Sequence, residues 1–150
     1  MGSIDSEIKS TFVNDQHRFV TNLVFTANWV QNIFTNELKP FDISSQQFNI
    51  LRILRGAGDW VVMSELKDGL LEKAPNATRL ANKLLTKGLI ERRRSEEDRR
   101  VVYVKVSKAG LELMEKIDQN ESPVQRALQN HITAEEARMV SDILDKFRGP

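Results

Sequence analysis

Residues 75–107 constrain the fold of this chain more than any other part of it. They begin with Pro75, whose missing N–H costs nothing in the first turn of a helix, and continue as a basic amphipathic helix. Gly88 follows where a left-handed backbone would end that helix. Two strand-like segments, 89–95 and 100–107, then flank a charged tip. A helix followed directly by a β-hairpin indicates a winged helix-turn-helix, which places one helix in a DNA groove and a loop beside it.

Helical patterns precede this stretch. Residues 5–38 predict one long helix, and Pro40 ends it. Its apolar surface is wider than a single core requires, which is typical of a helix that also packs against a partner. Apolar side chains recur along it at helical spacing at Phe12, Phe19, Leu23, Val30, Phe34 and Leu38.

Two shorter helices are predicted next. Ser44 and Gln47 have the spacing of a capping box, which opens the first of them, and Gly56 and Gly58 end it. A short β-like segment follows, and then a helix over residues 65–71. A short helix at this position suits the first helix of a helix-turn-helix.

Two further helices are predicted after the hairpin. The first runs over residues 108–130, with Pro123 as a candidate bend. Thr133 and Glu136 have the spacing of a second capping box, which opens the last helix. The apolar face of that helix consists of Ala137, Val140, Ile143, Leu144 and Phe147.

Together these elements predict a mainly α (α+β) fold, a winged helix-turn-helix with long N- and C-terminal dimerisation helices. The expected order is two helices, a short strand, two helices, a two-stranded wing and two helices. We expect a single domain over residues 1–150. Within it, residues 41–107 form the winged-helix lobe, and residues 5–38 and 108–148 form the dimerisation helices.

The composition excludes several classes of protein. The 150 residues are 40% hydrophobic, which is enough for a core, and they include no cysteine. Disulfides, thiolate metal sites and a cysteine-oxidation switch are therefore excluded. No apolar run approaches the roughly 18 residues of a membrane span, and the N-terminus lacks the pattern of a signal peptide. We expect a protein of a reducing compartment with no membrane partner.

The net charge of +1 conceals an uneven distribution of charge. Residues 73–100 hold nine Lys or Arg against four acids, and residues 101–110 add two Lys. A solvated face would explain an isolated basic run of this kind. Here the run coincides with the winged-helix pattern, so the combination favours a polyanionic partner, double-stranded DNA.

The sequence predicts no catalytic residue, no metal site and no cofactor. His17 and His131 are far apart and have no carboxylate or cysteine neighbours at metal-binding spacing. No segment matches a nucleophile elbow, a phosphate-binding glycine loop or a metal-binding helix motif. We therefore expect a protein that is not an enzyme.

Residues 76–92, 98–100 and 104–110 resemble the MarR family of bacterial transcription regulators. The family shows a Thr-Arg-Leu-like recognition helix, a Lys-Gly-Leu-Val-like helix stop, an Asp-x-Arg wing tip and a Leu-Thr-x-x-Gly-like exit into the next helix. The exit here, from Val106 to Gly110, is a conservative variant. The resemblance extends over essentially the whole chain. It implies a cytoplasmic bacterial homodimer, a pseudo-palindromic operator and often a small aromatic or phenolic effector.

Five residues of the recognition helix are candidates for DNA contact. Arg79 can donate two hydrogen bonds to guanine or hold a phosphate, and the amide of Asn76 can pair with adenine or a phosphate. Thr78 offers a hydroxyl group for a phosphate and a methyl group for thymine. Asn82 and Lys83 lie one turn further along the helix.

Each of these residues also has a simpler interpretation. Asn76 can serve only to start the helix. Arg79 or Lys83 can be a solvated charge or can pair with Glu72 or Glu91. Phosphate contacts position a protein without reading sequence, and the sequence does not sort these residues between phosphate and base contacts.

Three positions at the wing tip, and one on the strand before it, are further candidates. Arg100 is the candidate for insertion into a minor groove, because a narrow A·T-rich groove attracts a guanidinium group. The family's Asp-x-Arg pattern implies that Asp98 braces an arginine, although an ordinary β-turn aspartate is the alternative. Arg99 completes the tip. The arginines at 92–94 alternate sides of a strand, so not all can face DNA, and Arg94 is the preferred backbone contact.

The sequence therefore favours a dimeric, sequence-specific DNA-binding transcription regulator that acts as a ligand-responsive repressor. The alternative is a winged-helix protein-interaction module that does not bind DNA, and the basic wing argues against it. His17, Phe25 and Trp29 could line an effector cavity or could simply pack in the core and the dimer interface. No ligand-binding residue is assigned.

Overall fold

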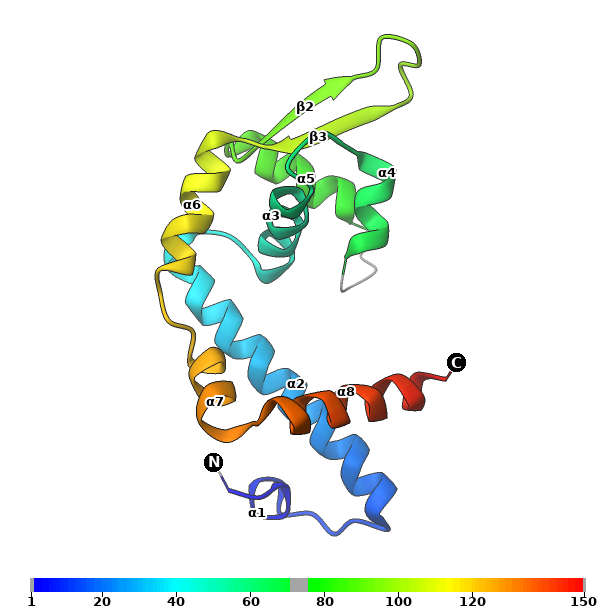
Figure 1. Ribbon diagram of the computed structural model, residues 1–150, viewed down its shortest axis with the longest axis vertical. Helices are drawn as coiled ribbons and strands as arrows, with labels where there is room; N and C mark the ends of the chain where they lie inside the picture. Colours follow the sequence, from blue (N-terminus) through cyan, green and yellow to red (C-terminus); the bar gives the residue numbers. More distant parts are fainter. Residues whose placement is uncertain (1, 71–75, 150) are drawn as a thin grey trace. The chain divides into compact units, whose positions relative to one another are not determined.

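The computed structural model describes residues 2–70 and 76–149 (Figure 1). Its contacts divide the chain into two compact units. One unit consists of residues 37–122, and the other joins the residues up to 36 with those from 123 onward. We describe each unit by itself.

The unit of residues 37–122 is a winged helix-turn-helix, as the sequence predicts. Its three-stranded antiparallel sheet has the order β1-β3-β2, and β2 and β3 form the hairpin that extends away from the helices in Figure 1. In chain order, the elements are α3 Ser45–Ala57, β1 Val61–Val62, α4 Met63–Leu66, α5 Ala77–Thr86, β2 Ile90–Arg94, β3 Val102–Val106 and α6 Lys108–Asp118, with short 3-10 turns at Lys39–Phe41 and Lys67–Gly69.

Local sequence signals account for the ends of α3 and α5. The capping box of Ser44 and Gln47 is formed, with both reciprocal hydrogen bonds present. Gly58 ends α3 with a left-handed backbone, φ +69°, whereas Gly56, predicted to help end the helix, lies inside it. Gly88 has φ +72°, and its N–H donates to the carbonyl of Leu85, so it ends α5 as predicted.

The helix before the recognition helix is shorter than the sequence predicts. The prediction placed it over residues 65–71, but α4 covers Met63–Leu66 and then tightens into the 3-10 turn Lys67–Gly69. Leu66 is its buried anchor in the core. A helix of this length has little stability of its own, so packing sets its bounds. The predicted end at residue 71, and the prediction for Pro75 in the next helix, lie outside the described residues.

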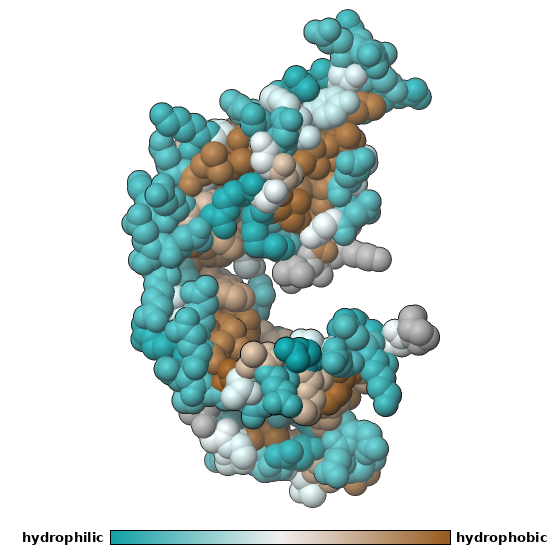
Figure 2. Space-filling model, viewed as in Figure 1, coloured by the Kyte–Doolittle hydropathy of each residue, from teal (hydrophilic) through white to brown (hydrophobic). Residues whose placement is uncertain are grey.

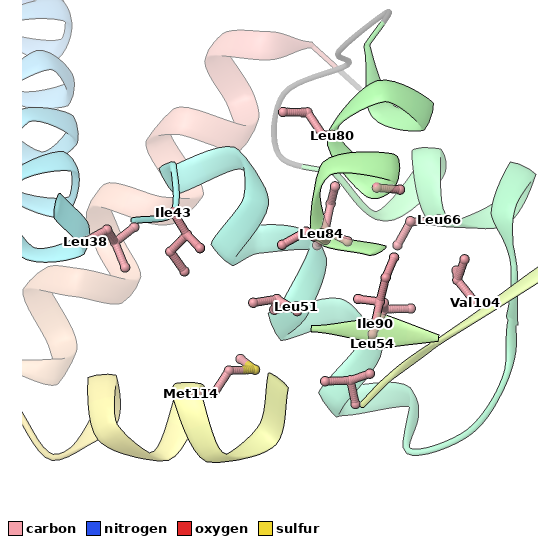
Figure 3. Packing of buried hydrophobic residues seen from close by; sticks show 13 residues of the cluster. Leu38, Ile43, Leu51, Leu54, Leu66, Leu80, Leu84, Ile90, Val104 and Met114 are labelled. Carbon is pink, nitrogen blue, oxygen red and sulfur yellow. The ribbon is translucent and has the colours of Figure 1, made fainter. Parts of the chain in front are cut away.

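The core of this unit lies where α3, α5, α6 and the sheet meet (Figure 3). The three longer helices, α4 and β3 each contribute at least one fully buried side chain, so helices and sheet pack around one core. The largest of these side chains are Ile50, Leu51 and Leu54 of α3, Leu66 of α4, Leu84 of α5, Val104 of β3 and Met114 of α6.

A hydrogen-bonded corner joins the end of α5 to the start of α6. The Ser107 hydroxyl donates to the carbonyl of Gly88 at 2.6 Å and accepts the N–H of Gly110 at 3.0 Å as the cap of α6. The Ser107 N–H donates to the carbonyl of Leu89 at 3.0 Å. Gly110 packs against that same carbonyl, and a Cβ at Gly110 would also come within 2.8 Å of Val106 Cγ2. In the Leu-Thr-x-x-Gly-like exit, the hydroxyl residue thus joins the two helix ends by hydrogen bonds, and the glycine allows the close approach of α6 to the Leu89 carbonyl.

The second unit contains two helices before residue 36, where the sequence predicts one. α1 covers Ile4–Ile8, and α2 covers Asp15–Leu38. The chain breaks between them because Lys9 is left-handed, φ +50°, and because Asn14 caps the new helix: its Oδ1 accepts the N–H of His17 at 2.8 Å. The prediction of one helix from residue 5 to 38 was therefore wrong at its N-terminal end.

The C-terminal part of this unit also differs from the prediction. The helix expected over residues 108–130 ends at Asp118, and a new helix, α7, covers Pro123–His131. Pro123 begins this helix, where a proline is tolerated, rather than bending a continuous one. The last helix, α8 Ala134–Arg148, opens with the predicted capping box of Thr133 and Glu136. The Phe19 ring of α2 meets the Phe147 ring of α8 edge to face at 5.8 Å.

The corner at Ser107 generates a prediction about stability. Replacement of Gly110 by Ala puts a methyl group against the Leu89 carbonyl, a backbone atom that cannot move aside, so we expect a loss of about 1–3 kcal/mol of unfolding free energy. Gly56→Ala is the matched control, because no atom lies within 4 Å of its added Cβ. It should raise stability by about 0.4–1 kcal/mol, because Ala has less unfolded-state freedom than Gly. Urea unfolding of both variants at one protein concentration tests this, and equal midpoints would contradict it.

Candidate nucleic-acid interface

The predicted contact residues of α5 lie on its exposed side. Thr78, Arg79, Asn82 and Lys83 are all exposed. The opposite side of α5 is buried in the core through Ala77, Leu80, Ala81 and Leu84. The helix is therefore held by its apolar side, which leaves a continuous polar side toward solvent.

Asn76 stands directly before this polar side. Its backbone is not helical, with φ −102° and ψ 13°, and its side chain makes no capping hydrogen bond. Asn76 does start the helix, because its backbone carbonyl accepts the N–H of Leu80 at 2.9 Å, but its side chain takes no part in the cap. The exposed amide is available to an external partner.

The cations of α5 are not neutralised by the neighbours that the sequence suggested. Among the described residues, neither Arg79 nor Lys83 takes part in an ion pair, and Glu91 pairs with neither of them. Glu72, the other proposed partner, lies outside the described residues. The exposed side of α5 thus carries net positive charge, which suits a polyanion.

The wing tip is closed by backbone hydrogen bonds. The Ser95 N–H donates to the carbonyl of Val101 at 3.0 Å, and the Val101 N–H donates to the carbonyl of Asp98 at 2.9 Å. The Ser95 hydroxyl accepts the N–H groups of Glu97 and Asp98, both at 3.2 Å. The tip therefore has a defined shape although its surface is hydrophilic (Figure 2).

Asp98 braces Arg100. Oδ1 of Asp98 accepts the backbone N–H of Arg100 at 3.0 Å and its Nε–H at 3.1 Å, and Oδ2 accepts an Nη2–H at 3.3 Å. The guanidinium of Arg100 lowers the pKa of Asp98 from its ordinary 3.8, and the backbone N–H of Arg100 adds to this effect. The carboxylate is therefore charged at neutral pH, and the brace is lost only as the pH falls through the lowered pKa. The Arg100 side chain remains 91% exposed.

The three arginines of β2 divide between the two faces of the hairpin. Arg93 pairs with Tyr103 across the sheet, and its guanidinium carbon lies 4.6 Å from the Trp60 ring centre and 5.4 Å from the Tyr103 ring centre. Lys105 approaches the same Trp60 ring at 5.9 Å. This cation–π cluster joins β2 and β3 to the residue that precedes β1, on the face of the sheet opposite Arg92 and Arg94.

Arg92 and Arg94 lie on the other face of the hairpin. The Arg94 guanidinium donates to the carbonyl of Arg99 at 3.4 Å, so it supports the tip from the strand below. Arg92 donates to Oδ1 of Asn82 at 3.5 Å and so faces α5. The sequence left Arg92 out of the site. The strand period of two already separates Arg92 from Arg93, but it does not show which face meets α5.

His17 has structural surroundings, and His131 is exposed at the end of α7. Nδ1 of His17 accepts the N–H of Val13 at 3.3 Å, and the His17 ring meets Phe12 edge to face, so the residue completes the start of α2. Within the described residues, no three His, Asp or Glu side chains are grouped as a metal site would require. In the same part of the chain, no helix has the length and apolar character needed to cross a membrane.

Known proteins with this arrangement regulate transcription. The MarR family profile matches residues 41–101. The multiple antibiotic resistance protein MarR of Salmonella typhimurium is 32% identical over 127 residues, which cover 83% of this chain and 88% of that protein. The MarR of Escherichia coli K12 is 30% identical over 126 residues, covering 83% and 87%.

Solved structures agree in fold. A mutant MarR from E. coli, crystallised with operator DNA, superposes with a TM-score of 0.74 at 26% identity and covers 91% of this chain and 99% of its own. An organohalide-sensing transcriptional regulator in its 2,4-dichlorophenol-bound form gives a TM-score of 0.78 and covers 91% and 80%. Its 20% identity shows the fold alone. Taken with the exposed cations of α5 and the braced wing, the match to MarR places this chain in the MarR family of DNA-binding transcription regulators, which are not enzymes.

Proposed function

We propose that this protein is a dimeric, sequence-specific repressor that binds a pseudo-palindromic operator and is released by a small ligand. One observation carries the DNA-binding part of the proposal: the exposed side of α5 holds cations without ion-pair partners in the described chain, and it lies in the same packed unit as a braced, basic wing. This arrangement fits a major groove and the groove next to it.

In this proposal α5 occupies the major groove. Arg79 reads a guanine edge or holds a phosphate, and Asn76 and Thr78 contact the groove near the helix start. Because Arg92 donates to Oδ1 of Asn82, the amide N–H groups of Asn82 face outward as donors. Lys83 extends the basic side by one turn.

The wing reaches the neighbouring minor groove. Arg100 enters the groove, and Asp98 holds its guanidinium in one orientation, which lowers the entropy lost on binding. Arg94 and Arg99 contact the DNA sugar-phosphate backbone on either side of that groove. The acidic residue is compatible with DNA because its charge is already paired with Arg100.

Dimerisation is supported by the unit that joins the N-terminal helices to α7 and α8. Among its described residues only Ile4 is buried, so this unit has little core of its own. Val24 of α2 is 55% exposed, and Val140 and Phe147 of α8 are 52% and 58% exposed. Apolar helical faces of this kind need a partner, and a second copy of the chain supplies the same faces.

The proposed ligand response draws on one structural relative and on the aromatic residues of α2. The organohalide-sensing regulator was solved with a phenolic compound bound, and this chain has half-buried aromatic residues on α2, among them Phe25 and Trp29. A small aromatic effector is therefore the class to test first. An oxidised-cysteine switch is excluded, because the chain has no cysteine.

The experiment that tests the proposed function is selection of bound sequences from a random pool of double-stranded DNA by the full chain. A two-fold symmetric consensus is the expected result. The contrary result is that no sequence is enriched and that raising the salt concentration does not weaken DNA binding. That result would favour a protein-interaction module that has lost DNA binding. The selected site then serves in the variants below.

Arg79→Ala should weaken operator binding by about 1–3 kcal/mol and relax the preference at one position of each half-site, if Arg79 reads a base edge. If Arg79 touches only phosphate, affinity should fall evenly across sequences and the salt slope should shrink by about one for each half-site. Lys116→Ala on the exposed side of α6 is the charge-matched control. Titration of operator and scrambled DNA at several salt concentrations separates the cases. Unchanged affinity and slope would remove Arg79 from the interface.

Arg100→Ala should weaken binding most on operators with A·T-rich flanks, because a narrow minor groove attracts the arginine. Asp98→Ala should reproduce part of this loss without removing a positive charge, because it frees the guanidinium from its brace. Both variants are titrated on operators with A·T-rich and G·C-rich flanks. An equal loss on both flanks for Arg100→Ala would limit the wing to backbone contacts. Tighter binding by Asp98→Ala would disprove the bracing role.

Replacement of Leu23 and Ile143 by Glu should convert the protein into monomers or aggregates, because charges then lie in the apolar faces of α2 and α8. Arg138→Glu is the control, because it puts the same side chain on an exposed position of α8 away from the apolar face. It should remain dimeric. Light scattering at micromolar concentration measures the mass of each variant, and a monomeric wild type would refute the dimer.

A further inference from the structure

The recognition helix has two flanks, and the wing covers only one of them. Arg92 lies on the wing side, where it contacts Asn82. On the other side, α5 borders the turn that precedes α3. A pocket of 650 Å³ opens there, and the residues lining it include Lys39, Asp42, Ser44, Lys83, Thr86 and Lys87. Every residue of this pocket belongs to the unit of residues 37–122.

Groove dimensions make this second flank important. The major groove of B-DNA is about 12 Å wide, and an α-helix with its side chains is about 10–12 Å across. A helix that fills the groove therefore brings both of its flanks close to a sugar-phosphate backbone. The wing-side flank presents Arg92 and Arg94 to one backbone. The surface beside the opposite flank of α5 must face the other sugar-phosphate backbone.

The charge of the pocket suits that position. Three lysines line it, from two segments far apart in sequence: Lys39 from the turn before α3, Lys83 from α5, and Lys87 directly after α5. One acid, Asp42, lines it with them. Lysine is a compact point charge that binds phosphate without demanding a fixed geometry. Three lysines therefore suit a phosphate group better than a base edge.

We propose that this pocket holds a phosphate of the DNA backbone, gripped by Lys39, Lys83 and Lys87, on the side of α5 opposite the wing. The proposal rests on the DNA-binding function proposed above and adds Lys39 and Lys87 to its interface. It assigns Lys83 to the backbone rather than to a base. Such contacts fix the depth and angle of α5 and carry no sequence preference of their own.

In the free protein, Asp42 holds the Lys87 ammonium group by two contacts. The Lys87 ammonium donates to the backbone carbonyl of Asp42 and lies 3.5 Å from its carboxylate. That carboxylate is 98% exposed, and exposed ion pairs are weak. A phosphate can therefore replace the carboxylate at Lys87 while the carbonyl contact stays. The negative charge of Asp42 opposes DNA binding. Its neutralisation should therefore raise DNA affinity, whereas loss of a lysine should lower it.

The test uses the full chain and its selected operator, with the variants Lys39→Gln, Lys87→Gln and Asp42→Asn. Log affinity is measured against log salt between 50 and 200 mM on operator and scrambled DNA. Each lysine variant should lower the salt slope by about 0.9 for each half-site, or about 1.8 for a dimer. Between 50 and 200 mM salt, the affinity of the wild type should therefore fall by a factor about threefold larger, for each lost contact, than the affinity of the variant. The ratio of operator to scrambled affinity should not change. Asp42→Asn should bind both DNAs more tightly.

The controls are Lys116→Gln and Glu112→Gln, which make the same charge changes at exposed positions of α6 outside the pocket. They should have the wild-type slope. Lys39→Gln decides the result if Lys87→Gln unfolds, because Lys87 also holds the turn at Asp42. Wild-type slopes in both lysine variants would overturn the proposal, and so would a change in the operator-to-scrambled ratio.

A small phosphorylated or carboxylated molecule could use the same chemistry. Calorimetric titration of the free protein with inorganic phosphate, at constant ionic strength, separates the two sources. If phosphate binds the free wild type and not Lys87→Gln, while the salt slopes of all variants remain equal, the pocket is a small-anion site and the DNA assignment is wrong. A wild type that binds no selected DNA would instead defeat the proposed function itself.

Discussion

The hydrogen-bonded corner at Ser107 is the interaction on which the geometry of the DNA-facing unit depends. One hydroxyl group donates to the carbonyl that ends α5 and accepts the N–H that begins α6, while the Ser107 N–H holds the Leu89 carbonyl. The recognition helix, the first wing strand and α6 therefore start or end at one point. Gly110 leaves no room for a Cβ, so the start of α6 packs directly against the Leu89 carbonyl. These bonds join the end of α5 to the base of the wing, far from its tip.

The arginines of β2 make two kinds of contact, one within the sheet and one on the face toward α5 and the tip. Arg93 is committed to the rings of Trp60 and Tyr103 and so joins β2 and β3 to the residue that precedes β1. Arg92 and Arg94 occupy the other face, one directed toward Asn82 and one supporting the tip. Net charge alone would count these arginines as equivalent. Because side chains alternate along a strand, Arg93 lies on one face of the sheet and Arg92 and Arg94 lie on the other.

The two units are stabilised in different ways. The unit of residues 37–122 has a complete core, with a fully buried side chain from nearly every element. In the other unit, Ile4 is the one buried residue among those described, and α8 buries none. In the proposed dimer, the surface that packs against a second copy would also set the spacing between the two recognition helices.

The sequence by itself determined the features that depend on residues close together in the chain. Both capping boxes, the stop at Gly88, the hairpin and the exposed side of α5 follow from local spacing and periodicity, and Asp98 and Arg100 are near enough in sequence for their contact to be anticipated. The break at residues 9–14 was not anticipated, because only the backbone shows the left-handed Lys9. At residues 119–122 the sequence predicted a bend at Pro123, whereas the structure has two separate helices. Tertiary structure also decided which β2 arginine faces α5, and it brought Lys39 and Asp42 beside Lys87 across more than 40 residues of chain. Contacts of that range depend on how α3, α5 and the sheet pack around one core, and no local pattern encodes that packing.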